Sequence, residues 1–137
     1  MCLSVKYPNR GVDWTVGYKV VTKRYDCWNA SGHSYHLPCF GGNEVEFNKE
    51  LNAKYFSPNS DVYPLNLTTD MDAEGVRENY VEGFHMFQHE VDARFWAFGS
   101  DEVFLAVGRN PRAYGEQSGF SCGVFEFVTI INPKIAT

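Results

Sequence analysis

The chain has 137 residues, of which 44% are hydrophobic and 16% aromatic, and its net charge is −5. This length fits a single domain, 1–137, and the apolar content is high enough to form a core, which excludes a disordered chain. A protein that follows a nucleic-acid backbone needs a basic surface, so 12 basic against 17 acidic residues argue against a nucleic-acid polymer as partner.

No stretch of the sequence approaches the ~20 consecutive apolar residues that a membrane span requires. Residues 1–10 also lack the apolar centre of a secretory signal. We therefore expect no membrane partner and a cytoplasmic location, in the host cytoplasm if the chain is viral. The 4 cysteines are then expected to be reduced.

The first predicted element is a strand over 12–22, because apolar or β-branched side chains occupy every second position. These side chains are Val12, Trp14, Val16, Tyr18, Val20 and Thr22. Residues 26–44 contain several Gly, Pro and Asn residues, which predicts a long loop or a poorly paired excursion. A short strand over 44–47 and a turn over 57–64 follow.

The second half contains the one clear predicted helix, over about 87–99. An apolar stripe recurs there at helical spacing, and Gly99 suits the position after the last turn. The stripe consists of Phe87, Val91, Phe95 and Phe98. Before it, Thr69 or Asp70 is expected to cap a short helical turn that begins at Met71.

Strands are predicted over 101–107 and 120–131, where apolar residues dominate. Between them, 108–119 carries three glycines and a proline and is predicted to be a second long loop. The elements together indicate an α+β fold: one strand-rich domain with a mostly antiparallel sheet, a single clear helix and long loops.

Two sets of residues have the spacing of metal ligands. His85 and His89 are four residues apart, which on a helix places both imidazoles on one face. The other set lies in the first predicted loop and consists of Cys27, His33, His36 and Cys39. Neither set contains a CxxC pair, so we predict no metal and no other cofactor, and the second set supplies the candidate ligands if a metal is bound.

The second predicted loop concentrates two arginines and a tyrosine in an acidic chain. Arginine forks match the geometry of phosphate groups, and a tyrosine ring offers a stacking face to a base. Arg109, Arg112 and Tyr114 are therefore predicted to contact a phosphorylated ligand. Lys19 would add charge, and His85 is predicted as a further contact. The alternative is a surface loop whose arginines serve only solubility.

Three short motifs resemble those of a group of small phage and bacterial proteins that have a GYK-type opening strand and a central GFH-type motif. The motifs are Gly17-Tyr18-Lys19, Gly83-Phe84-His85 and Phe125-Glu126-Phe127. The resemblance implies a phage-type protein. On that resemblance, we expect the partner to be a ligand or protein of the host cell.

The order of the elements is also similar to that of the ADP-ribosyltransferase fold. On that resemblance Glu126 stands where the family has its catalytic glutamate, and His85 stands at the segment with hydroxyl side chains. Met86 and Phe87 replace the remaining hydroxyl residues of that segment. The resemblance therefore implies a nucleotide-binding cleft more than it implies transfer chemistry.

Three hypotheses follow from these features. The first is a non-enzymatic phage-type protein that counteracts host defence by sequestering a small nucleotide-like immune signal. The second is an ADP-ribosyltransferase-like or other NAD-consuming enzyme, with Glu126 and His85 as its catalytic residues. The third is a protein that inhibits a host factor through its aromatic surface. A homo-oligomer is compatible with each.

Overall fold

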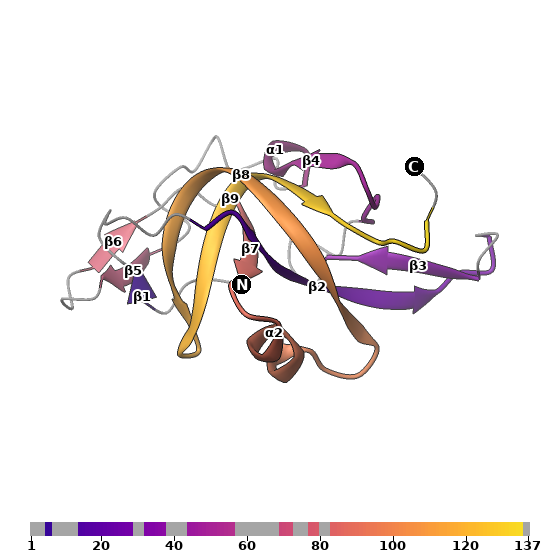
Figure 1. Ribbon diagram of the computed structural model, residues 1–137, viewed down its shortest axis with the longest axis horizontal. Helices are drawn as coiled ribbons and strands as arrows, with labels where there is room; N and C mark the ends of the chain where they lie inside the picture. Colours follow the sequence, from indigo (N-terminus) through magenta and orange to yellow (C-terminus); the bar gives the residue numbers. More distant parts are fainter. Residues whose placement is uncertain are drawn as a thin grey trace.

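A computed structural model describes residues 5–6, 14–28, 32–37, 44–56, 69–72, 77–79 and 83–135. Strands dominate these residues (Figure 1). The described strands are β1 (Val5–Lys6), β2 (Val16–Tyr25), β3 (His33–His36), β4 (Glu50–Asn52), β5 (Thr69–Asp72), β6 (Arg77–Asn79), β7 (Phe84–Phe87), β8 (Asp101–Gln117) and β9 (Phe120–Ile130). The described helices are α1 (Ala53–Phe56) and α2 (Glu90–Trp96).

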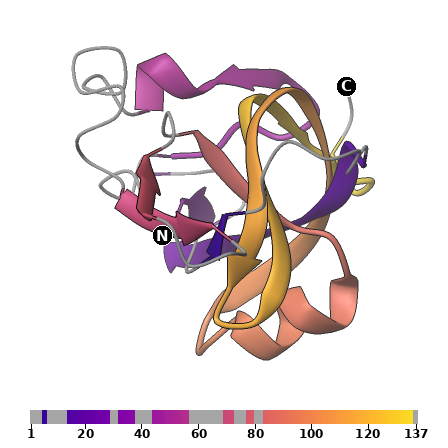
Figure 2. The same ribbon diagram turned by 90° about the vertical axis from the view of Figure 1, so that its left-hand side faces the viewer.

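Four of the strands form a closed ring. β2 pairs with β7, β7 with β9, β9 with β8, and β8 again with β2, and all four pairings are antiparallel. β8 and β9 are long and bend together, so each contributes to more than one wall of the ring (Figures 1 and 2). β3 and β4 extend the sheet beside β2 and β9, and β1, β5 and β6 extend it from the far end of β8.

The bend of the β8–β9 ribbon coincides with a bulge. The pairing register shifts between Pro111 and Ala113, and Asn110 has a positive φ of 57°. An extra residue in one strand increases the local twist and bends the ribbon, and asparagine tolerates the left-handed conformation better than most residues. The proline lies at this irregularity, where a missing backbone N–H costs least.

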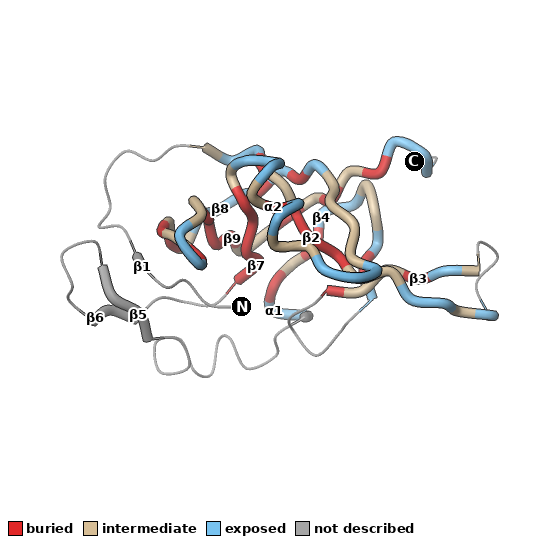
Figure 3. Tube along the Cα trace, turned by 90° about the horizontal axis from the view of Figure 1, so that it is seen from below, coloured by how far each residue is buried: buried red, intermediate tan, exposed pale blue. Residues whose placement is uncertain are grey.

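The core fills the inside of the ring. Its buried residues include Val21, Leu37, Leu51, Phe84, Met86, Phe125, Val128 and Ile130. The rings of Trp14, Tyr114 and Phe125 pack against one another, with centroids 5.6 to 6.0 Å apart. Figure 3 shows buried residues along β7 and β9 and exposed residues at the far ends of β2 and β3.

The ring of Phe125 lies directly against the β8–β9 ribbon because two positions lack a side chain. A Cβ atom on Gly108 would lie 2.5 Å from the ring of Phe125, and one on Gly123 would lie 2.8 Å from the same ring. Glycine at both positions therefore makes room for a large aromatic side chain inside the ribbon.

Several predicted elements are confirmed. The strand over 12–22 corresponds to β2, and the strands over 101–107 and 120–131 belong to β8 and β9. The helix over 87–99 is confirmed as α2, and Gly99 has a φ of 62°, as expected after a helix. The fold is strand-rich with a mostly antiparallel sheet, and its described helices have only four and seven residues.

Other predicted elements are wrong. Residues 108–117 are not a loop, because β8 continues through them and turns only at Ser118 and Gly119. Gly108 makes room for the ring of Phe125 and Pro111 lies at the bulge, so neither residue belongs to a turn. The expected helical turn from Met71 is strand β5, which pairs with β1 and β6.

The first predicted loop also contains a strand. Residues His33–His36 form β3, which pairs with the end of β2. The short strand expected over 44–47 is reduced to a single bridge between Glu44 and His36, and β4 begins later, at Glu50. The turn predicted over 57–64 lies outside the described residues. Neither described helix has the length and apolar character that crossing a membrane demands.

Replacing Gly108 by Val is expected to lower the free energy of unfolding by about 1–3 kcal/mol, because the new side chain overlaps the ring of Phe125. Urea denaturation followed by tryptophan fluorescence measures this change. Val107→Ala is the matched control, since Val107 is the neighbouring residue of β8 and is 38% exposed. Equal midpoints for the two variants would contradict the proposed contact.

Candidate functional site

The two predicted phosphate-binding arginines lie on β8 beside the bulge. Arg109 donates two hydrogen bonds to Glu50, at 2.8 and 3.0 Å, and its guanidinium lies 3.9 Å above the ring of Phe127. The guanidinium of Arg112 lies 3.8 Å from Oε2 of Glu126. β4 supplies the first carboxylate and β9 the second.

Both arginines are therefore balanced by carboxylates. The hydrogen bonds from Arg109 lower the pKa of Glu50 and raise that of Arg109. Asn110 donates a further hydrogen bond to Glu126. A phosphate group at this position would have to displace one or both carboxylates, because they already balance the two guanidinium groups.

Of the other three predicted ligand residues, two are buried and Tyr114 is partly buried. Tyr114 packs between Trp14 and Phe125, and its hydroxyl donates to the carbonyl of Trp14 at 3.1 Å. Lys19 is 1% exposed and His85 is 3% exposed. The structure therefore does not bring the five predicted residues together on one surface.

His85 is placed by β7 in a buried environment. Its Nδ1 lies 3.2 Å from the carbonyl oxygen of Gly83. Burial and the nearby charge of Lys19 hold the pKa of His85 well below its usual range. The contacts described for Glu126 are with Asn110 and Arg112. A substrate of the proposed enzyme would have to reach a histidine that is almost fully covered.

The predicted metal ligands do not form a site among the described residues. Cys27 and His33 are both exposed, and His36 forms a hydrogen bond of 2.7 Å with Ser34. Cys39 lies outside the described residues. In the described part of the chain, no three His, Cys, Asp or Glu side chains gather in a way that could hold a metal ion.

The second histidine pair does not share a helix. His85 lies on β7, whereas His89 precedes α2 and is exposed. The condition for a metal pair, that both imidazoles lie on one helical face, is therefore not met. Of the two cysteines described, Cys122 is buried and Cys27 is exposed, and neither forms a disulfide.

Three large apolar side chains on α2 or directly after it are exposed. Val91 is 71% exposed, Phe95 79% and Phe98 87%. We call these three residues the α2 ridge. The opposite side of the helix packs on the sheet through Ala93, which is fully buried. The small alanine lets the helix lie close to β2 and β7, and the larger apolar residues then point outward.

The sequence thus predicted the apolar stripe, but it did not predict whether the stripe faces the core or the solvent. Phe87 belongs to β7 and is buried, whereas the three residues of the ridge face solvent. Helical spacing identifies a common face and says nothing about which face meets the core. The sequence does contain a signal for the buried face of the helix, namely a second stripe formed by Ala93, Trp96 and Ala97. Two of these residues are small, and Trp96 packs on Phe87 with ring centroids 5.9 Å apart.

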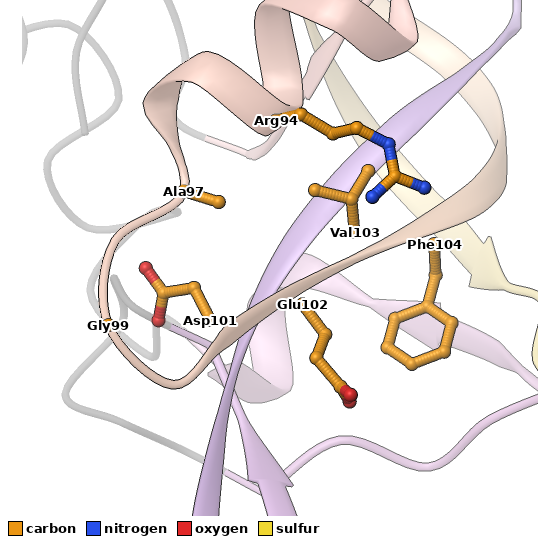
Figure 4. Close-up of a pocket in the computed structure, with 7 residues that line it drawn as sticks. All are labelled: Arg94, Ala97, Gly99, Asp101, Glu102, Val103 and Phe104. Carbon is orange, nitrogen blue, oxygen red and sulfur yellow. The ribbon is translucent and has the colours of Figure 1, made fainter.

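A pocket of about 440 Å³ lies beside the ridge, between the end of α2 and the start of β8 (Figure 4). It is lined by Arg94, Ala97, Gly99, Asp101, Glu102, Val103 and Phe104. Two smaller pockets, of about 280 and 250 Å³, lie on either side of Tyr35. Burial and the neighbouring Glu102 raise the pKa of Tyr35. Carboxylates outnumber cationic groups in one of the two smaller pockets and equal them in the other. This balance does not favour an anionic ligand in either pocket.

No protein-family model, no curated protein and no solved structure matches this chain. The resemblances to small phage proteins and to the ADP-ribosyltransferase fold therefore stay predictions.

The free energy of unfolding is expected to fall as the pH decreases below 6.5. The folded state holds the pKa of His85 well below 6.5, so the unfolded state binds a proton that the folded state does not. Stability is full above pH 6.5 and is lost by up to about 1.4 kcal/mol per pH unit below it, until the folded His85 is also protonated. Urea titrations between pH 7.5 and 5 measure this slope.

Replacing His85 by Gln should reduce that slope, whereas His89→Gln, at an exposed histidine, should leave it unchanged. An identical slope in the parent protein and the His85→Gln variant would rule out His85 as its source.

Proposed function

We propose that this protein is a cytoplasmic, non-enzymatic module that binds another protein through the α2 ridge. The observation that carries the proposal is the exposure of Val91 and Phe95 on α2 and of Phe98, two residues after its end, between 71% and 87%. Large aromatic side chains contribute most to the free energy of protein association when they become buried. If the resemblance to phage proteins holds, the partner is a factor of the host cell.

The ridge is held in place by the core beneath it. The ring of Phe95 lies 5.4 Å from that of Phe120, and Phe120 in turn contacts Phe87 with centroids 6.4 Å apart. An exposed side chain that is already positioned loses little conformational entropy when a partner covers it. Burying each ridge side chain would contribute about 1.5–3 kcal/mol to binding.

The apolar surface continues on the sheet beyond the helix. Val16 and Val107 pair directly across β2 and β8, and both are exposed, as is Leu105 two residues earlier on β8. Because α2 has only seven residues, it covers only part of this face of the sheet. Contiguous exposed apolar surface of this kind is typical of interaction sites.

A photo-crosslinking amino acid at position 95 is expected to trap the partner in cells that produce the protein. p-Benzoylphenylalanine resembles Phe95 and reacts with whatever covers it. The matched control carries the same group at Tyr55, which is 73% exposed on α1. A discrete adduct at position 95, absent at position 55, supports the proposal.

Changing Phe98 to Ser should remove that adduct with little change in the urea midpoint, because Phe98 is 87% exposed and contributes little to the core. Absence of any adduct at position 95, or the same adducts at positions 95 and 55, would refute the ridge as the binding surface.

A second proposal is that the protein sequesters a small phosphorylated ligand, such as a nucleotide immune signal, at the bulge of β8. One observation favours it. The bulge places Arg109 and Arg112 on either side of Asn110, and Glu126 interacts with Asn110 and Arg112 and influences Arg109. A phosphate that replaced this carboxylate would meet both guanidinium groups, while the ring of Phe127 supports one of them.

Replacing Arg109 and Arg112 together by Ala should abolish retention of such a ligand. The parent protein is mixed with NAD, ADP-ribose and cyclic di- and trinucleotides, the free pool is removed by filtration, and heat releases the bound pool for mass spectrometry. A ligand returned intact supports sequestration, and one returned altered supports an enzyme. Retention that is equal in the parent and the double variant would exclude this site.

A further inference from the structure

The first residues of β8 are paired on one side only. Residues 101–104 pair with β2, whereas β9 ends at Ile130 and first meets β8 at Ala106. In the described part of the chain, no strand pairs with the other side of residues 101–104. This segment is therefore an open sheet edge, although it lies within an otherwise closed ring.

The backbone groups of Val103 point outward from this edge. Along an antiparallel strand, the N–H and C=O groups of successive residues point alternately toward the two sides. The carbonyl of Ser100 accepts from the N–H of Lys23, on the β2 side, at 3.2 Å. The carbonyl of Leu105 accepts from the N–H of Ile131, on the opposite side, at 2.8 Å. Val103 lies two residues before Leu105, so its N–H and C=O point away from β2.

The open edge borders the pocket at the end of α2. In Figure 4, Arg94 and Val103 lie on one side of the β8 ribbon, and Glu102 and Phe104 lie on the other. A strand placed along this edge would direct its side chains alternately to these two sides. The pocket, of about 440 Å³, leaves room for them.

The charges at the edge favour a basic occupant. Arg94 is already held by Glu90 through two hydrogen bonds, at 2.8 and 3.2 Å. Lys23 lies 4.0 Å from Oε1 of Glu102, but the Oε2 atom of Glu102 is buried without a hydrogen-bond partner. Asp101 and Glu102 line the pocket beside Arg94, its one basic lining residue, whereas Lys134 shares a smaller pocket with Glu102. A cationic side chain from an added strand would satisfy the Oε2 atom of Glu102, which is now unsatisfied.

We propose that the edge of β8 at residues 101–104 receives an extended, basic segment of a partner protein as an added β-strand. The proposal rests on the protein-binding function proposed above and specifies the partner's chemistry. Ridge and edge are continuous, because Phe98 of the ridge lies next to Ala97 and Gly99 of the pocket. Main-chain hydrogen bonds would give affinity and the alternating side chains specificity.

A second copy of this chain is a poorer occupant of the edge. Two such edges would bring Asp101 and Glu102 of both copies together, and like charges on paired strands are destabilising. Charges on a sheet edge also serve in some proteins to keep all strands away. If the charges at this edge keep all strands away, a basic strand binds no better than an acidic one, and an experiment can decide this.

The probe is a capped peptide of about nine residues in which Val and Lys alternate, and its twin carries Glu in place of Lys. Amide hydrogen exchange of the purified full chain is followed by NMR. We expect the Val103 amide to exchange fast in the free protein and about tenfold more slowly with the Lys peptide, but not with its twin. The Glu102 and Phe104 amides, which point toward β2, should be protected throughout. Equal effects of the two peptides, no effect of either, or a Val103 amide already protected in the free protein would overturn the proposal.

Two variants test the same edge. Val103→Pro removes the N–H group that points away from β2 and leaves the hydrogen bonds to β2 in place. It should weaken binding of the Lys peptide by about tenfold, measured by fluorescence anisotropy, and leave the circular dichroism spectrum unchanged. Glu102→Lys should reverse the preference, so that the Glu peptide binds better. An unchanged preference in this second variant refutes the charge argument even if the proline variant fails to fold.

The two proposals fail in different ways. If the adduct at position 95 forms equally well after Val103→Pro, the ridge stands and the edge does not contribute to partner binding. If the Lys peptide binds the edge but no adduct forms at position 95, the edge stands and the ridge is refuted.

Discussion

The fold depends on the contact between the ring of Phe125 and the backbone at Gly108 and Gly123. An aromatic ring inside a two-stranded ribbon needs neighbouring positions without side chains, because a Cβ atom at either glycine would overlap it. With the ring in place, the β8–β9 ribbon bends inward, and β8 reaches β2 as well as β9. The closed ring, the direction of the bulge and the support beneath α2 all follow from this bend. The ring of Trp14 packs against both Phe125 and Tyr114, which fixes the residues directly before β2.

The sequence was sufficient for the elements whose pattern is local. Alternation along 16–22 and helical spacing along 91–98 reflect the periods of a strand and a helix, and both elements are present. Gly108 and Pro111 misled the prediction, because such residues are more common in turns than within strands. Here their role depends on Phe125, more than ten residues away along the chain, and no local rule contains that information. β3 was missed for a similar reason, since His33–His36 is polar and is a strand only because β2 pairs with it.

The residues of the predicted ligand site lie in different places in the structure, for a physical reason. Arg109, Arg112 and Tyr114 lie within six residues, which suggested one surface, but a strand directs neighbouring side chains to different environments. Tyr114 became part of the aromatic core, and the arginines met carboxylates from β4 and β9. Lys19 was expected to add charge to a ligand site and is buried within β2. The residues that now suggest function, on α2 and at the start of β8, were visible in the sequence only as a stripe and a strand.

The turn at Ser118 and Gly119 has a consequence for how the chain folds. Both residues have positive φ, of 53° and 85°, as in the tight turns that match the twist of paired strands. The hairpin of β8 and β9 therefore forms from contacts that are close in the sequence, with a small loss of chain entropy. β2, in contrast, finds β7 and β8 only after more than sixty intervening residues have been made, since Tyr18 pairs with Phe87 and Val16 with Val107. During synthesis, the end of β2 can pair early with β3, but the part that pairs with β7 and β8 must wait until the β8–β9 hairpin has left the ribosome. The waiting time of β2, and not the speed of the hairpin, then determines how long the nascent chain is exposed to aggregation.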